Sequence, residues 1–187
     1  MRFHTKALLK LMKQSHKGGG IKVLRTEMYL RDCFFLSGAG WALLIPKEKC
    51  PGEITGQLVT WLADMPRIGD GFWIVKGFDP KPMDPDEKSL CVPDYTSRTY
   101  NLGMKPLPLR TETDFLVQLG DRAVAALDMG AEAVVDGSVN LGAFDPPAFV
   151  AQWQDEETDA LFWADNDIVN VCEKARTAAA ACNVWEN

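Results

Sequence analysis

Histidine is nearly missing from this 187-residue chain, because His4 and His16 are its only two. Both precede a run of three glycines at residues 18–20. A Ser-His or Cys-His catalytic pair needs an imidazole base beside its nucleophile, and here the N-terminal segment would have to supply that base. We therefore expect no such catalysis, no zinc site built from His and Cys, no cofactor, and full function when either histidine is replaced.

Cysteine pairs and long apolar runs are also missing. The five cysteines are scattered and odd in number: Cys33, Cys50, Cys91, Cys172 and Cys182. No Cys-x-x-Cys motif occurs, so a disulfide framework is a poor interpretation and five reduced thiols in a cytoplasmic protein are expected. No apolar run approaches the roughly 18 residues that cross a bilayer, so we expect no membrane span.

Charge is distributed unevenly along the chain, although the net value is only −6. Residues 1–32 contain eight Lys/Arg and two acids, which gives +6. Residues 33–110 contain nine of each, and residues 111–187 contain three Lys/Arg and fifteen acids, which gives −12. A surface field of one sign selects which partners approach it and how fast. The charge distribution is therefore informative about the charge of binding partners and does not indicate any particular reaction.

The positive charge at the start of the chain has a helical spacing. Four lysines recur at steps of four, three and four residues: Lys6, Lys10, Lys13 and Lys17. The apolar residues expected on the opposite face are Leu8, Leu9, Leu11 and Met12. We predict a basic amphipathic helix and a glycine joint over residues 1–20, followed by one domain over residues 21–187. The lysines either point outward from a helix docked on its own core, or meet nucleic acid, an anionic membrane or a protein groove.

The remaining pattern predicts an α+β fold with a mainly antiparallel sheet built from hairpins. Apolar runs at 33–36 and 41–45 flank the glycine-containing segment 37–40, which predicts a hairpin. A further strand is expected over residues 71–78. About four helices are expected to pack on one face of the sheet, over residues 54–62, 111–129, 145–153 and from 167 onward. A division into two domains near residues 103–110 is the alternative.

The densest acidic cluster is the candidate partner-binding surface. Its members are Asp155, Glu156, Glu157, Asp159, Asp165 and Asp167. The alternating acids, central glycine and terminal glutamate of a calcium loop are missing here, and so we expect no metal at this cluster. A merely solvated acidic surface is the simplest alternative.

These observations together favour a non-catalytic binding protein. We expect an inhibitor or accessory factor whose acidic face meets a basic partner, because carboxylates can imitate the phosphate field of nucleic acid. Such a partner would belong to a nucleic-acid-handling assembly, by analogy with small phage or plasmid proteins. Direct contact with nucleic acid is expected only through the N-terminal helix. The alternatives are a carboxylate- and Mg²⁺-dependent enzyme, or a structural subunit that assembles as a homo-oligomer through its N-terminal helix.

Overall fold

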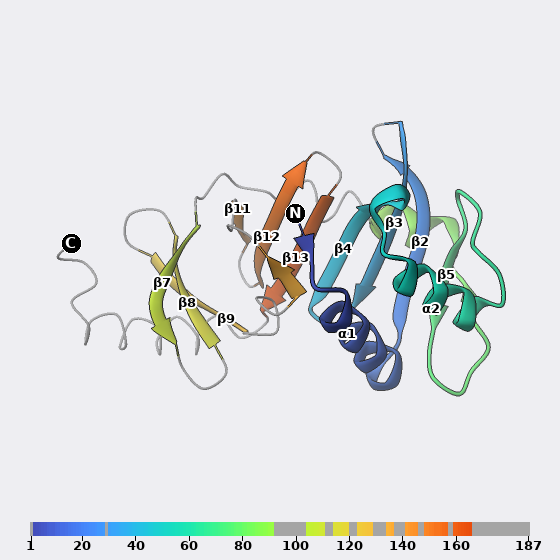
Figure 1. Ribbon diagram of the computed structural model, residues 1–187, viewed down its shortest axis with the longest axis horizontal. Coiled ribbons are helices and arrows are strands. Elements are labelled where there is room, and N and C mark those ends of the chain that lie inside the picture. The colour runs from blue at the N-terminus through green and yellow to red at the C-terminus, as the bar shows by residue number, and fades with distance from the viewer. Residues whose placement is uncertain are drawn as a thin grey trace.

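The computed structural model describes residues 2–28, 30–91, 104–110, 114–119, 123–128, 134–136, 141–145, 148–156 and 159–165. Side-chain positions are described for residues 3–28 and 30–88 and for Val134. The described helices are α1 (Thr5–Gly18), α2 (Gly52–Leu62) and α3 (Pro85–Cys91), with a short 3₁₀ turn, η1, at Lys47–Lys49. Figure 1 shows their arrangement around the sheet.

An antiparallel sheet of eight strands forms the main layer, in the order β11-β12-β13-β4-β3-β2-β5-β6. In that order the strands are β11 (Leu141–Asp145), β12 (Ala148–Glu156), β13 (Asp159–Asp165), β4 (Trp41–Pro46), β3 (Arg31–Gly38), β2 (Ile21–Met28), β5 (Gly71–Ile74) and β6 (Lys81–Pro82). The hairpin predicted around residues 37–40 is confirmed, because Gly38 pairs with Trp41 across the β3–β4 turn. A segment from late in the chain, β13, lies directly beside β4.

Two smaller sheets complete the described strands. One of them has three strands in the order β7-β8-β9: β7 (Met104–Arg110), β8 (Asp114–Leu119) and β9 (Ala123–Asp128). The strand before α1, β1 (Arg2–Phe3), pairs with β10 (Val135–Asp136). The backbone N–H of His4 then donates to the Val134 carbonyl over 2.9 Å, so the N-terminus is held where α1 begins.

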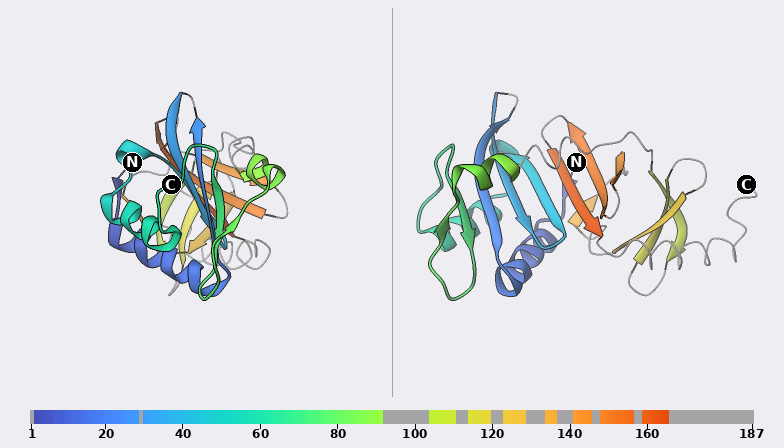
Figure 2. Two further views of the ribbon diagram at one scale, coloured as in Figure 1. Left: turned by 90° about the vertical axis from the view of Figure 1, so that its right-hand side faces the viewer. Right: turned by 180° about the vertical axis from the view of Figure 1, so that it is seen from behind.

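Both faces of the central strands are buried, because alternate residues of a strand point to opposite sides. One face packs against α1 and α2 and contributes Ile21, Val23, Phe34, Leu36, Trp41, Leu43 and Ile45. The other face contributes Leu24, Cys33, Phe35, Ala42 and Leu44 and is joined by Met83. Seen from behind, the segment that ends in α3 crosses this second face (Figure 2, right). The sheet is therefore a middle layer, and its strands read as nearly continuous apolar runs.

Helix α1 belongs to this core. Leu8 and Met12, one turn apart, are both 0% exposed, and Ile54 and Leu58 of α2 join them in the same cluster. Beyond the helix, the N–H groups of Gly19 and Gly20 both donate to the Ser15 carbonyl. Gly20 has a φ of +109°, and a Cβ there would stand 2.2 Å from the Trp73 indole nitrogen. Gly20, the last residue of the glycine joint, is therefore closely packed, whereas Gly18 and Gly19 are exposed.

The α+β class and the antiparallel sheet are confirmed, whereas the expectation of about four sheet-packed helices is not. The described part of the chain has three α-helices, counting α1. The helix predicted over residues 111–129 is wrong, since β8 and β9 lie there and Phe115 pairs with Leu127. The helix predicted over 145–153 is also wrong, because β12 pairs with both β11 and β13. The helix expected from residue 167 lies outside the described residues.

Candidate binding surfaces

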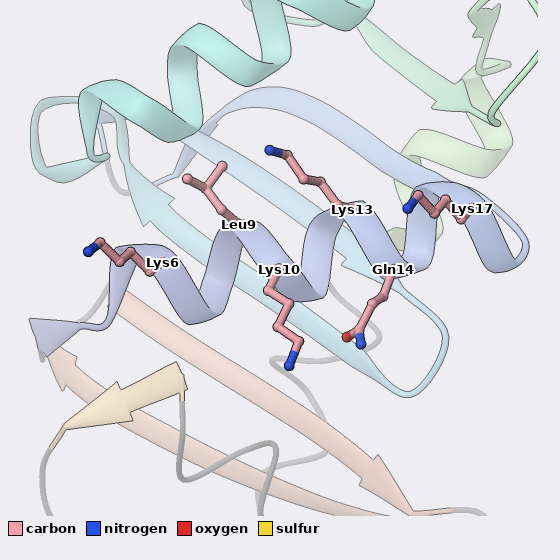
Figure 3. Close-up of a pocket in the computed structure, with 6 residues that line it drawn as sticks. All are labelled: Lys6, Leu9, Lys10, Lys13, Gln14 and Lys17. Carbon is pink, nitrogen blue, oxygen red and sulfur yellow. The ribbon is translucent and has the colours of Figure 1, made fainter.

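The four lysines predicted to share one helical side do so, and we call Lys6, Lys10, Lys13 and Lys17 the lysine face. Together with Leu9 and Gln14 they line an open hollow of about 500 Å³ on the outer side of α1 (Figure 3). All four lysines are exposed. Leu9 was expected on the opposite side of the helix. Leu9 instead borders the lysines and is also packed, partly buried, against the core. Its position on the helix lies between the lysine face and the buried side.

The ammonium groups of the lysine face are not neutralised by any side chain that the structure describes. Within the described part of the chain, none of the four forms an ion pair or a side-chain hydrogen bond. In the same part of the chain, Arg25 and Lys47 instead form ion pairs with Asp32. An exposed set of unpaired cations on one helix therefore remains available to an external anion.

The position of α1 is fixed by specific polar contacts as well as by its apolar side. The Trp41 indole nitrogen Nε1 donates to the Ser15 hydroxyl over 2.9 Å. The backbone N–H of Lys76 donates to the His16 carbonyl over 3.0 Å, beside the last turn of the helix. Because both contacts tie α1 to the sheet region, the lysine face is carried on a helix of fixed orientation.

His16 has a packing role on this helix. Its ring lies against Trp61 of α2 with centroids 4.5 Å apart. Burial lowers the pKa of His16 below its ordinary 6.5, and the nearby charges of Lys76 and Lys17 lower it further. The neutral imidazole is therefore favoured at neutral pH, as suits a ring packed against an indole.

The predicted acidic residues are separated into two places by the strand register. Asp155 and Glu156 end β12 and Asp159 begins β13, and Glu156 pairs with Asp159 across the turn. We call Asp155, Glu156, Glu157 and Asp159 the acidic hairpin; Glu157 follows Glu156 in the sequence but lies outside the described residues, as does Asp167. Asp165 ends β13 opposite Phe149, six residues from Asp159 and so about 20 Å away along the strand.

The acidic hairpin lies at a definite end of the main sheet. Ala160 pairs with Leu44, so Asp159 is level with the last residues of β4. The chain leaves β4 there and enters η1, which carries Lys47 and Lys49. Basic residues of η1 therefore share this end of the sheet with the acidic hairpin.

A cluster that the sequence did not reveal is centred on Arg25 in β2. Its guanidinium makes two hydrogen bonds to Asp32, Nε to Oδ1 at 2.8 Å and Nη2 to Oδ2 at 2.6 Å. Nη1 of Arg25 donates a third hydrogen bond, 2.6 Å long, to the Pro66 carbonyl. This pairing lowers the pKa of the Asp32 carboxyl and raises that of Arg25. Every strong contact here is internal, so the cluster fastens the segment after α2 to the β2–β3 hairpin.

The described residues offer little for nucleophilic or metal chemistry. Burial raises the pKa of the Cys50 thiol to about 12, so the reactive thiolate is strongly disfavoured at neutral pH. Cys33 is buried, and neither of these two cysteines forms a disulfide. Among the described residues, no group of three or more His, Cys, Asp or Glu side chains is placed to hold a metal ion.

No protein-family model, curated protein or solved structure matches this chain. Among the described residues, no helix combines the length and apolar composition that a bilayer crossing requires.

Proposed function

We propose that this chain is a non-catalytic binding protein, an inhibitor or accessory factor, whose acidic hairpin meets a basic partner in a nucleic-acid-handling assembly. One observation carries the proposal. The pairing of Glu156 with Asp159 brings acidic residues of two strands together at one hairpin end. This end belongs to a region, residues 111–187, that carries −12.

A compact acidic group of this kind affects association more than it affects folding. Complementary charge speeds diffusional encounter and suppresses partners of the same sign. A surface that binds nucleic acid is basic, so acidic residues paired at one hairpin end are suited to occupy it. Lys47 and Lys49 of η1 lie at the same end of the sheet, but Lys47 already forms an ion pair with Asp32, and residues 111–187 carry −12.

The enzyme alternative requires carboxylates that converge on one cation. Mg²⁺ takes about six oxygen ligands at about 2.1 Å, and Asp165 lies about 20 Å along β13 from the hairpin. A site using all six predicted acids is therefore disfavoured by the register. Titration with MgCl₂ tests it directly, because a magnesium enzyme would gain thermal stability with the ion and a binding protein of the proposed kind would not.

The structural-subunit alternative requires α1 to pack on another copy. Leu8 and Met12 are buried in the core of their own chain, which leaves that side of α1 occupied. Deleting residues 1–20 would open this core, so the informative test is sedimentation of the full chain across a wide concentration range. Assembly that grows with concentration would favour the alternative.

Affinity purification from the native host tests the proposal itself. The bait is the full chain, compared with a hairpin variant carrying Asp155→Asn, Glu156→Gln, Glu157→Gln and Asp159→Asn. A control variant makes the same charge change at exposed acids elsewhere: Glu27→Gln, Glu53→Gln, Asp64→Asn and Asp79→Asn. We expect a basic protein to be recovered with the full chain and the control and lost with the hairpin variant. Retention by the hairpin variant would refute the assigned surface.

A further inference from the structure

We propose that the lysine face of α1 binds the phosphate backbone of double-stranded nucleic acid. This is a second surface, distinct from the acidic hairpin, and it gives the protein direct contact with nucleic acid as well as with a basic partner. It stands on its own evidence, since it concerns side chains at the other end of the sequence.

The spacing of the lysines suits a repeating anion. Lys17 comes eleven positions after Lys6, so the row is about 16 Å long at about 1.5 Å per residue. One strand of a duplex carries a charge about every 3.4 Å along its axis, so the row is as long as roughly five phosphates. An ammonium group is a compact point charge with no preference for a planar partner. A row of four therefore fits a charged backbone better than a single shaped ligand.

The helix that carries the row is already ordered before any ligand arrives. Its inner side is fixed by Leu8 and Met12 and its last turn by the Ser15 hydroxyl. No carboxylate of the described residues competes for the four ammonium groups. Gln14, beside them, supplies a neutral amide donor of the kind that contacts phosphate and sugar. Binding is thus not opposed by the cost of folding a helix.

Two other anionic partners are disfavoured by the same contacts. A membrane-surface helix inserts its apolar side among lipids, and a helix that enters a protein groove uses its apolar side as the anchor. In α1 that side is occupied, because Leu8 and Met12 are 0% exposed.

Single strands are disfavoured by composition. Proteins that hold them stack bases on aromatic rings. The described residues around the lysine hollow include Leu9 and Gln14 but no aromatic side chain. The absence of arginine among them also removes the bidentate reading of guanine. Binding through this face is therefore expected to be independent of sequence and strongest for a duplex.

Fluorescence anisotropy with a labelled duplex of about 20 base pairs, in salt from about 0.05 to 0.2 M, tests the proposal. The full chain is compared with a lysine-face variant: Lys6→Gln, Lys10→Gln, Lys13→Gln and Lys17→Gln. The control variant makes the same charge change at exposed residues away from α1: Lys47→Gln, Lys49→Gln, Arg67→Gln and Lys81→Gln. Urea unfolding of each variant establishes that it is folded.

Four phosphate contacts predict a slope of about −3.6 in the logarithm of affinity against that of salt, a loss on the order of a hundredfold over this range. We expect the lysine-face variant to bind at least about thirtyfold more weakly with a much flatter slope, and the control to stay within about threefold of the full chain. The hairpin variant should bind the duplex at least as well as the full chain, so a failure of the acidic-hairpin proposal leaves this result intact.

Several outcomes would overturn the duplex proposal. One is no binding of the duplex by the full chain at the lowest salt, and another is equal binding by the lysine-face variant. Tighter binding of a single strand of the same length would assign the face to single strands instead. Self-association that disappears in the lysine-face variant, without duplex binding, would assign it to the acidic region of a second copy.

Discussion

The Trp41 indole at the start of β4 donates a hydrogen bond of 2.9 Å to the Ser15 hydroxyl in the last turns of α1. Trp41 is 1% exposed, so its N–H is shielded from water. Gly38, which pairs with Trp41, lies against both groups, and a Cβ there would stand 2.3 Å from the Ser15 hydroxyl oxygen. The β3–β4 turn and α1 are therefore fitted to each other at this point.

Replacing Ser15 with Ala tests this relationship. The buried Trp41 N–H loses its acceptor, and a buried polar group left unpaired costs about 1–3 kcal/mol. We expect the free energy of unfolding to fall by about 1–2 kcal/mol in urea titrations. Thr60→Ala removes an exposed helix hydroxyl that donates to Gly56 and should change stability by less than about 0.5 kcal/mol. Equal effects of the two changes would show that the indole contact is unimportant.

Leu8→Ala tests whether α1 is part of the core. Leu8 is 0% exposed in the main cluster, and replacing a buried leucine with alanine costs about 2–5 kcal/mol. Leu9→Ala is the matched control, because half-buried Leu9 borders the lysine face, and it should cost clearly less. Urea unfolding measures both, and a Leu8→Ala variant as stable as Leu9→Ala would contradict the docking of α1.

Ala63 follows α2 in a left-handed conformation, with a φ of +66°. Such a backbone costs a residue with a Cβ about 1–2 kcal/mol, and glycine is the common residue at this helix end. We expect Ala63→Gly to raise the free energy of unfolding by about 1 kcal/mol. Gly56 lies inside the same helix, and no atom lies near the position of a Cβ there. Gly56→Ala should therefore also raise the free energy of unfolding, because alanine has the higher helix propensity. Glycine is thus favoured at position 63 and disfavoured at position 56. Destabilisation by Ala63→Gly would contradict the left-handed backbone conformation of Ala63.

His16 predicts a specific pH dependence of stability. Its pKa in the folded protein is lowered, first by burial and then by Lys76 and Lys17, so the unfolded chain binds the proton more readily. The contribution of His16 is therefore fully present above its ordinary pKa of 6.5 and is lost as pH falls through the folded value. Thermal unfolding between about pH 7.5 and 5 should show this loss in the natural chain.

His16→Phe is the control for that measurement, since it keeps a ring against Trp61 and removes the titrating group. Its stability should change less over the same pH range. Asp32, whose pKa is lowered by its hydrogen bonds with Arg25, loses its contribution only at more acidic pH, below its ordinary 3.8. An identical pH profile for the natural chain and His16→Phe would show that His16 does not titrate as proposed.

The parts of the fold that were predicted correctly are those specified by local pattern. The lysine and leucine spacing is enough to predict α1, and the helical spacing of apolar residues over 54–62 is enough to predict α2. The β3–β4 hairpin follows from two short apolar runs around glycines. In each of these, neighbours in the sequence are also neighbours in the structure.

The later segments show why local pattern is insufficient. Phe115, Leu116, Leu119 and Ala123 fit a helical spacing, yet alternate residues of 114–119 also fit a strand. The antiparallel pairing of β8 with β9 decides between helix and strand. Similarly, β12 is fixed by partners on both sides, and one of them, β13, also joins the distant β4. Such long-range pairing is not readable from a window of residues.

The lysine face could be predicted from spacing, whereas its unpaired charges and the occupied inner side of α1 could not. The acidic residues were recognisable as a dense run in the sequence. Their division between a hairpin end and the far end of β13 depends on register. The ion pair of Arg25 with Asp32 was missed because the two residues lie on different strands of a hairpin, seven positions apart in the sequence.

The rate at which the purified basic partner associates with this chain tests the acidic-hairpin proposal most directly. Surface plasmon resonance would compare the full chain, the hairpin variant and its charge-matched control in salt from about 0.05 to 0.5 M, over which screening shortens from beyond 10 Å to a few Å. We predict that association of the full chain slows steeply with salt, and that the hairpin variant binds about tenfold or more weakly, roughly 1.4 kcal/mol. Equal rates and affinities for the full chain and the hairpin variant at every salt concentration would contradict a binding role for this surface.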